Sequence, residues 1–322
     1  MKQLISMPVG RQTPQSYPDL SSACKQARCD GLEVMWCGDE LPAIPEGVGI
    51  GYHLAYYPDW LDFWREDWDA LKRKFGERGA WEEFYGGKGR DQLLKYFAAD
   101  LDRAEAQHAE YVSFRVSDAS IEESFSYQWE HSDEEVIDAA ADILNQIFAN
   151  RRSNMLLLLE NQWWPGFSFT APKLTQRLMD AIDYPNKGIM LDTGHVMNCN
   201  YMLKTEKEGV AYIQEQLDRH GELCQLIRGV RLHQSLSGRY VRENMGRIPS
   251  NLPENYWLRY SMGCNHVFNI DQHQPWHHKS IRTVLDRLQP DYLVHELRNT
   301  CPADLLQRIR IQQRTLSMKE KA

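Results

Sequence analysis

Short apolar runs recur along the chain, and each is bounded by glycine, proline or charged residues. Continuous apolar runs of this length are typical of strands that are buried on both faces of a parallel sheet. Runs of this kind occupy residues 2–8, 31–36, 49–54, 111–117, 154–161, 188–195, 228–235 and 292–299. The pattern therefore predicts eight strands.

Segments with helical spacing separate most of these runs. The clearest are residues 91–109, 132–152 and 171–182. Ser132 is followed three residues later by Glu135, which predicts a capping box at the start of the second helix. Strands that alternate with helices indicate a parallel sheet, and eight such units predict one α/β domain over residues 1–322, a (β/α)8 TIM barrel.

Two connections depart from the regular alternation. Residues 37–48 contain two prolines and two glycines, so we do not expect a full crossover helix there. Residues 234–276 are far longer than a common loop and predict an excursion over one barrel mouth after the seventh strand. No linker or internal repeat marks a domain boundary.

Composition narrows the class of partner. Hydrophobic residues make up 42% of the 322 residues and charged residues 25%, which suits a globular protein with a sizeable core. The formal net charge of −8 argues against a broad nucleic-acid-binding face. The seven cysteines have no CxxC spacing, which favours reduced thiols and a cytoplasmic location. No apolar run is long enough to span a membrane, so we expect no membrane association.

Ligand-type side chains stand at the ends of four predicted strands: Glu160, Asp192, His233 and Glu296. The carboxyl ends of barrel strands meet at one mouth, so these side chains are expected to converge. Each alone has a structural alternative as a helix cap, an ion-pair partner or a buried core residue. Together, three carboxylates and one imidazole predict a site for a divalent metal, Zn²⁺ or Mn²⁺.

The stretch LDTGH at residues 191–195 follows an apolar strand, with Glu160 before it, His233 after it and Glu296 on the last strand. This arrangement resembles the xylose isomerase-like TIM-barrel superfamily, which includes ketose 3-epimerases, inosose isomerases and dehydratases, and the endonuclease IV enzymes. The resemblance spans roughly the whole chain. It implies that Glu160, Asp192, His233 and Glu296 bind a single metal, and that Glu160 and Glu296 are the catalytic carboxylates.

The resemblance also implies further site residues. His195 matches a histidine that contacts substrate in epimerases and binds another zinc in endonuclease IV. Asp271 and His273 match an Asp-x-His pattern of the nuclease and, with His195, imply a second metal or a substrate contact; the alternative is a turn in a polar loop. His53 matches a nuclease histidine, but the strand with Arg115 lacks the partner ligand, so a complete three-zinc set is not expected.

The first functional hypothesis is a metal-dependent isomerase or epimerase that acts on a small sugar or polyol. In this reading His53 and Arg115 bind the substrate, and Glu33 either contacts it or hydrogen-bonds to a site residue. Aromatic residues in 53–64 and 161–167 follow strand ends, where they either wall the pocket or pack loops over the barrel.

The second hypothesis is a two-metal phosphodiesterase resembling endonuclease IV. Asp271 and His273 favour this hypothesis, and phosphate binding stays open because four arginines cluster near the end of the seventh strand, namely Arg231, Arg239, Arg242 and Arg247. A third reading is a non-catalytic barrel that keeps a metal only for structure. One bound ion per chain favours the isomerase, two favour the hydrolase, and none with an intact fold favours a non-catalytic barrel. Association of chains into a homo-oligomer stays open.

Overall fold

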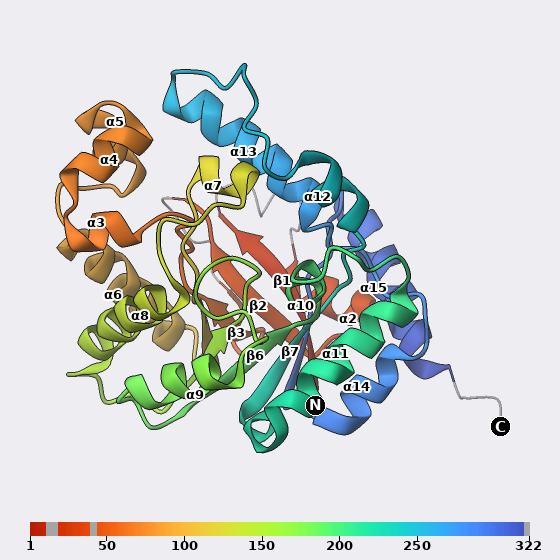
Figure 1. Cartoon of the computed structure of the whole chain (residues 1–322). Coiled ribbons are helices and arrows are strands. Elements are labelled where there is room, and N and C mark those ends of the chain that lie inside the picture. Colours follow the sequence, from red (N-terminus) through yellow and green to blue (C-terminus); the bar gives the residue numbers. More distant parts are fainter. Residues whose placement is uncertain (11–18, 39–43, 319–322) are drawn as a thin grey trace.

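Eight parallel strands close into a barrel in the computed structural model of the chain, which describes residues 1–10, 19–38 and 44–318 (Figure 1). Each strand pairs with the next, and the first pairs with the eighth. The strands are β1 (Lys2–Val9), β2 (Gly31–Trp36), β3 (Gly49–His53), β4 (Tyr111–Arg115), β5 (Leu156–Glu160), β6 (Lys187–Asp192), β7 (Ile227–Leu232) and β8 (Tyr292–His295). The predicted (β/α)8 barrel is confirmed.

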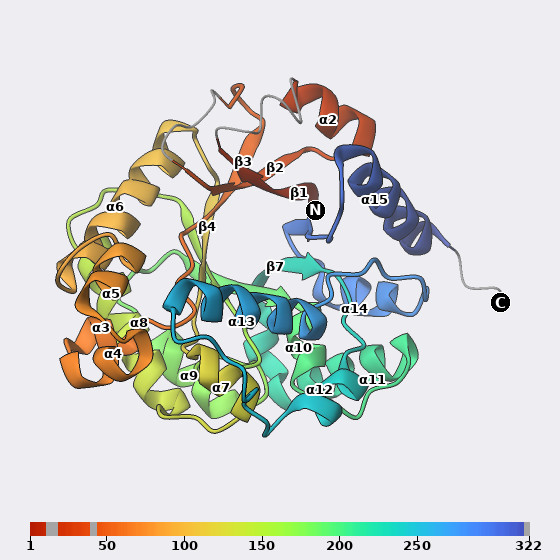
Figure 2. The same ribbon diagram turned by 90° about the horizontal axis from the view of Figure 1, so that it is seen from above.

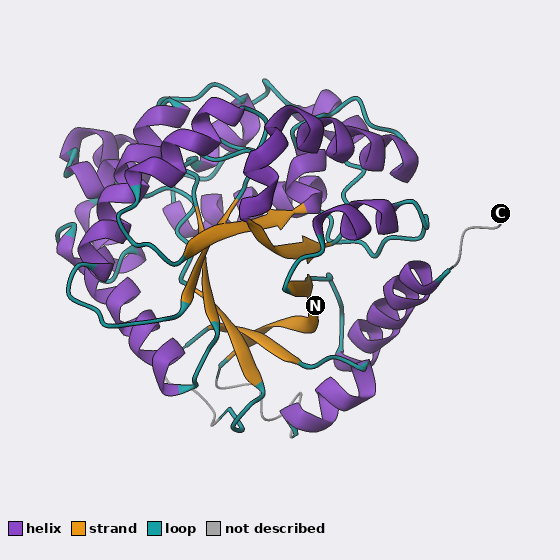
Figure 3. Ribbon diagram, turned by 90° about the horizontal axis from the view of Figure 1, so that it is seen from below, coloured by secondary structure: helices purple, strands orange, loops and turns teal. Residues whose placement is uncertain are grey.

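Helices surround the closed sheet, as the view from below shows (Figure 3). Those that cover the strands are α2 (Leu20–Ala27), α6 (Asp91–Ala106), α8 (Asp133–Phe148), α9 (Pro172–Ala181), α11 (Glu206–His220), the 3-10 helix η1 (Gly221–Leu226), α14 (Ile281–Leu288) and α15 (Pro302–Ser317). The three helices expected from periodicity are α6, α8 and α9. The capping box is also present, because Ser132 and Glu135 each accept a hydrogen bond from the other's backbone N–H.

Further helices lie over the carboxyl ends of the strands. After β3 the chain forms α3 (Leu61–Arg65), α4 (Trp68–Phe75) and α5 (Arg78–Phe84), and α7 (Ile121–Ser126) follows β4. The long segment after β7 forms α12 (Gly238–Asn244) and α13 (Tyr256–Ile270). Figures 1 and 2 show α13 above the barrel beside α7 and α12, which confirms the predicted excursion.

The prediction that residues 37–48 contain no full crossover helix falls partly on residues 39–43, which lie outside the described residues. In the described ranges, no helix is long and apolar enough to cross a membrane.

The side chains that fill the interior of the barrel form layers. Alternate residues of a strand face the same side of a sheet, so inward positions recur every second residue. A small apolar cluster, distinct from the main core between strands and helices, includes Leu158, Met190 and Val294. Each of these residues lies two positions before a predicted ligand, at Glu160, Asp192 and Glu296. The sequence thus places an apolar layer beneath a polar layer at the mouth.

Candidate metal and substrate site at the barrel mouth

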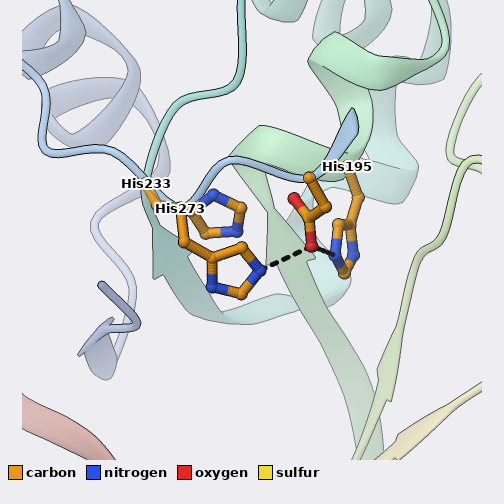
Figure 4. Close-up of side chains that lie close together, drawn as sticks. His195, His233 and His273 are labelled. Atoms are coloured by element: carbon orange, nitrogen blue, oxygen red, sulfur yellow. Dashed lines mark hydrogen bonds and ion pairs between the residues drawn. The ribbon is translucent and has the colours of Figure 1, made fainter. Parts of the chain in front are cut away.

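Four side chains form a compact group of potential metal ligands at the mouth: His195, His233, Asp271 and His273. One ligand atom from each lies within 4.8 Å of the others. Asp271 Oδ2 is 3.2 Å from His195 Nε2 and 2.5 Å from His273 Nε2. The His233 and His273 rings stack with centroids 4.1 Å apart. Figure 4 shows the three imidazoles close together, with the Asp271 carboxylate between His195 and His273. We call these four residues the histidine cluster.

The LDTGH turn positions two members of this cluster. Asp192 ends β6 and caps α10 (Thr193–Asn198), because its Oδ1 accepts a hydrogen bond from the His195 backbone N–H at 2.8 Å. Its Oδ2 lies 3.0 Å from His233 Nε2. The residue directly before His195 has to be glycine, since a Cβ on Gly194 would lie 2.0 Å from His233 Cε1. Asp192 and Gly194 therefore fix the ring of His233.

The histidine cluster fits a divalent metal of the zinc type. Its donors are three imidazoles and one carboxylate, the types that Zn²⁺ prefers. His233 Nδ1 is buried and has no hydrogen-bond partner among the described residues. Burial lowers the pKa of His195, but the carboxylates of Asp192 and Asp271 outweigh it and raise this pKa to about 9. The negative charge around the imidazoles therefore stabilises a cation here.

Glu160 and Glu296, two of the predicted ligands, are ion-paired with arginines. Arg115 Nε lies 2.7 Å from Glu160 Oε1, and Arg115 Nη2 lies 3.2 Å from Glu296 Oε1. Arg231 Nη2 lies 2.9 Å from Glu160 Oε2, and Arg231 Nη1 contacts Glu296 Oε2. Burial raises the pKa of both carboxyls, but the two guanidiniums outweigh burial and hold each pKa well below its usual range. Both glutamates are therefore ionised.

Arg231 lies inside the barrel, although it was expected among the arginines near the end of the seventh strand. Its side chain is fully buried, and its Nη1 is 2.6 Å from Glu33 Oε1. The arginines expected together near the end of β7 do not form one group, because Arg231 is buried inside the barrel whereas Arg239 is exposed and pairs with Glu243 on the surface. The spacing contains a signal for the true position: Arg231 precedes His233 by two residues, so both face inward.

The remaining predicted residues divide between the cavity and the barrel interior. Arg115 lines the cavity at the mouth. Glu33 lies below it and accepts a hydrogen bond from Tyr111 Oη at 2.8 Å in addition to its ion pair. His53 is buried, and its Nδ1 donates to the Leu54 carbonyl at 2.6 Å, while its Nε2 lies 3.5 Å from Glu160 Oε2. Glu33 and His53 therefore contact site residues.

A cavity of about 260 Å³ opens above these groups. Asp271, His273, Arg115 and Glu296 supply its charged wall. Aromatic side chains form another part of its lining, namely Tyr56, Trp163, Trp164, Tyr256, Tyr260 and Phe268. Both readings of the aromatic segments therefore apply: Tyr56 and the two tryptophans wall the cavity, whereas Tyr57 packs against rings of α5 and α6. The volume suits a small molecule.

Another acidic group lies near the α3–α5 insertion and already holds a cation of the chain. Asp62, Glu130 and His131 place potential ligand atoms close together. Lys74 Nζ, however, lies 2.6 Å from Asp62 Oδ2 and 3.1 Å from Asp59 Oδ1. This buried lysine neutralises the carboxylates, and we interpret the group as structural.

The fold and the mouth together define a (β/α)8 barrel with a candidate metal site at the carboxyl ends of its strands. The family model described as "Xylose isomerase-like TIM barrel" matches residues 23–302. The chain belongs to this family, which confirms the resemblance seen in the sequence. No curated protein matches the sequence at a significant level.

Solved structures show the same fold at low identity. A D-tagatose 3-epimerase-like protein is 14% identical, with a TM-score of 0.53, over 98% of this chain and 97% of that one. Endonuclease IV from Thermus thermophilus is 15% identical, with a TM-score of 0.54, over 98% of this chain and 99% of that one. The neighbours thus include both an epimerase-like protein and a nuclease.

Proposed function

We propose that the protein is a divalent-metal-dependent isomerase or epimerase that acts on a small sugar or polyol. The supporting observation is that one cavity of about 260 Å³ is lined by a carboxylate, an imidazole and a guanidinium, from Glu296, His273 and Arg115. These are the groups needed to remove a proton next to a carbonyl and to stabilise the charge that develops. The family and the epimerase-like neighbour agree with this chemistry.

His195, His233, Asp271 and His273 would hold the ion, with Zn²⁺ and Mn²⁺ as the candidates. When bound, such an ion polarises a carbon–oxygen bond and acidifies the adjacent C–H. His273 Nδ1 lies 3.6 Å from Glu296 Oε1, so the ligand group and the carboxylate adjoin on one wall of the cavity. A substrate with neighbouring oxygen atoms fits between them.

Glu296 is the proposed proton acceptor at the substrate carbon. In the unliganded site Arg115 and Arg231 weaken it as a base, because they hold its pKa low. A substrate oxygen that accepts hydrogen bonds from Arg115 draws this guanidinium from Glu296 and thereby strengthens the base. Glu160 lies behind Arg115 and positions it through a 2.7 Å contact, with His53 next to its other oxygen. Glu296 then returns the proton to the neighbouring carbon on the same face while the hydroxyl proton moves to the adjacent oxygen, which isomerises the substrate; epimerisation would need a second group that delivers a proton to the opposite face.

Hydrogen exchange tests the proposal directly. A panel of ketoses and inososes is incubated with metal-loaded protein in D2O, and deuterium incorporation next to the carbonyl is followed by NMR. We expect exchange with at least one substrate and its loss in Glu296→Gln, with Asp138→Asn on the exposed surface as a control that exchanges normally. Exchange at the wild-type rate in Glu296→Gln would remove the assigned role.

A metal-dependent phosphodiesterase is the second candidate, and one observation favours it. His195, Asp271 and His273 are close enough to hold an ion that activates water. The small cavity and the net charge of −8 weigh against a DNA substrate. Metal-dependent hydrolysis of bis(p-nitrophenyl) phosphate or of an abasic oligonucleotide, without deuterium exchange in any sugar, would replace the isomerase proposal.

A further inference from the structure

Arg231 occupies the centre of the inward-facing carboxylates. Its guanidinium contacts Glu33, Glu160 and Glu296, and its Nε lies 3.9 Å from Asp192 Oδ2. The side chain has no exposed surface. A cation of the chain itself therefore lies where the four-residue ligand set expected from the sequence would place a metal.

Each oxygen of the two glutamates lies within ion-pair distance of a guanidinium, although Glu160 Oε2 accepts no hydrogen bond from the described residues. Glu160 directs Oε1 to Arg115 and Oε2 to Arg231. Glu296 repeats this pattern, with Oε1 on Arg115 and Oε2 on Arg231. An ion bound between these glutamates would displace both guanidiniums and then lie beside two positive charges, which Coulomb repulsion opposes.

The buried ion pair with Glu33 holds the Arg231 side chain in this position. It lies in β7 with its side chain inside the barrel, and Glu33 beneath it is held by Tyr111. Moving the guanidinium away would leave the buried carboxylate of Glu33 without its charge partner, at a large desolvation cost. Arg115, by contrast, lines the open cavity and can turn toward a substrate.

We infer that Arg231, assisted by Arg115, replaces a metal ion among Glu160, Asp192 and Glu296, so that the chain binds a single divalent ion at the histidine cluster. The inference rests on the proposed function only in assigning that ion to the cluster. The carboxylate half of the mouth then works with arginine as its cation, and the metal contacts substrate from the histidine side.

Metal counting and the absorption spectrum of bound Co²⁺ test this assignment. Protein stripped with a chelator is loaded with Zn²⁺, desalted and measured by inductively coupled plasma mass spectrometry. We expect one zinc per chain in the wild type and two in Arg231→His, which removes the internal cation and supplies a ligand. The Co²⁺ spectrum is expected to stay unchanged in Glu296→Gln and to change in His273→Ala.

The outcomes separate the inference from the proposed function. Two zinc ions in the wild type, no gain of zinc in a folded Arg231→His protein relative to the wild type, or an altered Co²⁺ spectrum in Glu296→Gln would each overturn the inference. No zinc in the wild type but one in Arg231→His would support the replacement of a metal by Arg231, and it would overturn the assignment of an ion to the histidine cluster on which the proposed function relies. If Arg231→His does not fold, the wild-type count and the Glu296→Gln spectrum still decide.

Discussion

The substitution Gly194→Ala tests whether the ring of His233 is a metal ligand held in place by close packing. The new Cβ would lie 2.0 Å from Cε1 of that ring, whereas ordinary contact begins at 3.4 Å. The ring would therefore have to retreat by about 1.4 Å. A metal–nitrogen bond tolerates only about 0.2 Å, so the retreat removes this ligand.

The ring cannot make this movement freely. It stacks on His273 at 4.1 Å, and its Nε2 is 3.0 Å from Asp192 Oδ2. The backbone carbonyl of His233 accepts a 2.9 Å hydrogen bond from Trp276 Nε1. Overpacking at such a site costs about 1–3 kcal/mol of folding free energy. We expect Gly194→Ala to lower the free energy of unfolding by this amount and the zinc affinity at least about tenfold.

A matched control is available in α5. Gly79, like Gly194, is the second residue of its helix, but a Cβ there meets no atom within 4 Å. Gly79→Ala should therefore stabilise the protein by about 0.5–1 kcal/mol and leave zinc binding unchanged. Urea unfolding and calorimetric zinc titration measure both quantities. Wild-type zinc affinity in Gly194→Ala, together with lost affinity in His273→Ala, would refute the assignment of His233 as a ligand.

Three further predictions concern charge. Burial raises the pKa of Asp62, but its contacts with His131 and Lys74 outweigh burial and lower it to about 2. The unfolded value is about 3.9, so Asp62 stabilises the fold by about 2–3 kcal/mol above that pH, and this is lost as pH falls through about 2. In urea unfolding, Asp62→Asn should show its largest loss at neutral pH and little below pH 2, while Asp138→Asn stays near wild type throughout. Glu33→Gln removes the buried partner of Arg231 and should lower the free energy of unfolding by about 3–5 kcal/mol; a loss below about 1 kcal/mol would contradict the ion-pair account. Arg115→Lys loses the two-pronged contact and should raise KM for the exchanging sugar at least about tenfold, and an unchanged KM would exclude a substrate contact.

The barrel could be predicted because each of its strands is marked in the sequence by a continuous apolar run. A strand buried on both faces is apolar throughout, and eight such runs leave few other folds. The run at residues 188–195 was nevertheless too long, since β6 ends at Asp192 and His195 already belongs to α10. The Asp192 side chain accepts a hydrogen bond from the backbone N–H of His195 and caps that helix, so the residue that ends the strand also starts the helix.

The mouth was only partly predictable. The carboxyl ends of the barrel strands meet at one mouth, so the sequence alone could assign Glu160, Asp192 and Glu296 to one site. The partners of these residues could not, because Arg231 and Glu33 are 198 positions apart in the chain and meet only through barrel closure. The helix α13 was missed for another reason: its aromatic and glycine-containing sequence has weak amphipathic character, and its cavity contacts depend on the fold.

Charge compensation links these observations to the chemistry. A barrel mouth with three buried carboxylates needs positive charge, and a metal or an arginine can supply it. In this chain the guanidiniums neutralise Glu160 and Glu296, whereas the histidine cluster keeps Asp271 between two imidazoles. The two halves adjoin where His273 Nδ1 lies 3.6 Å from Glu296 Oε1. Under the proposed function, a substrate placed at this junction would meet the ion on one side and Glu296 as proton acceptor on the other, so that arginine in place of a metal would divide the two roles between the halves of the mouth.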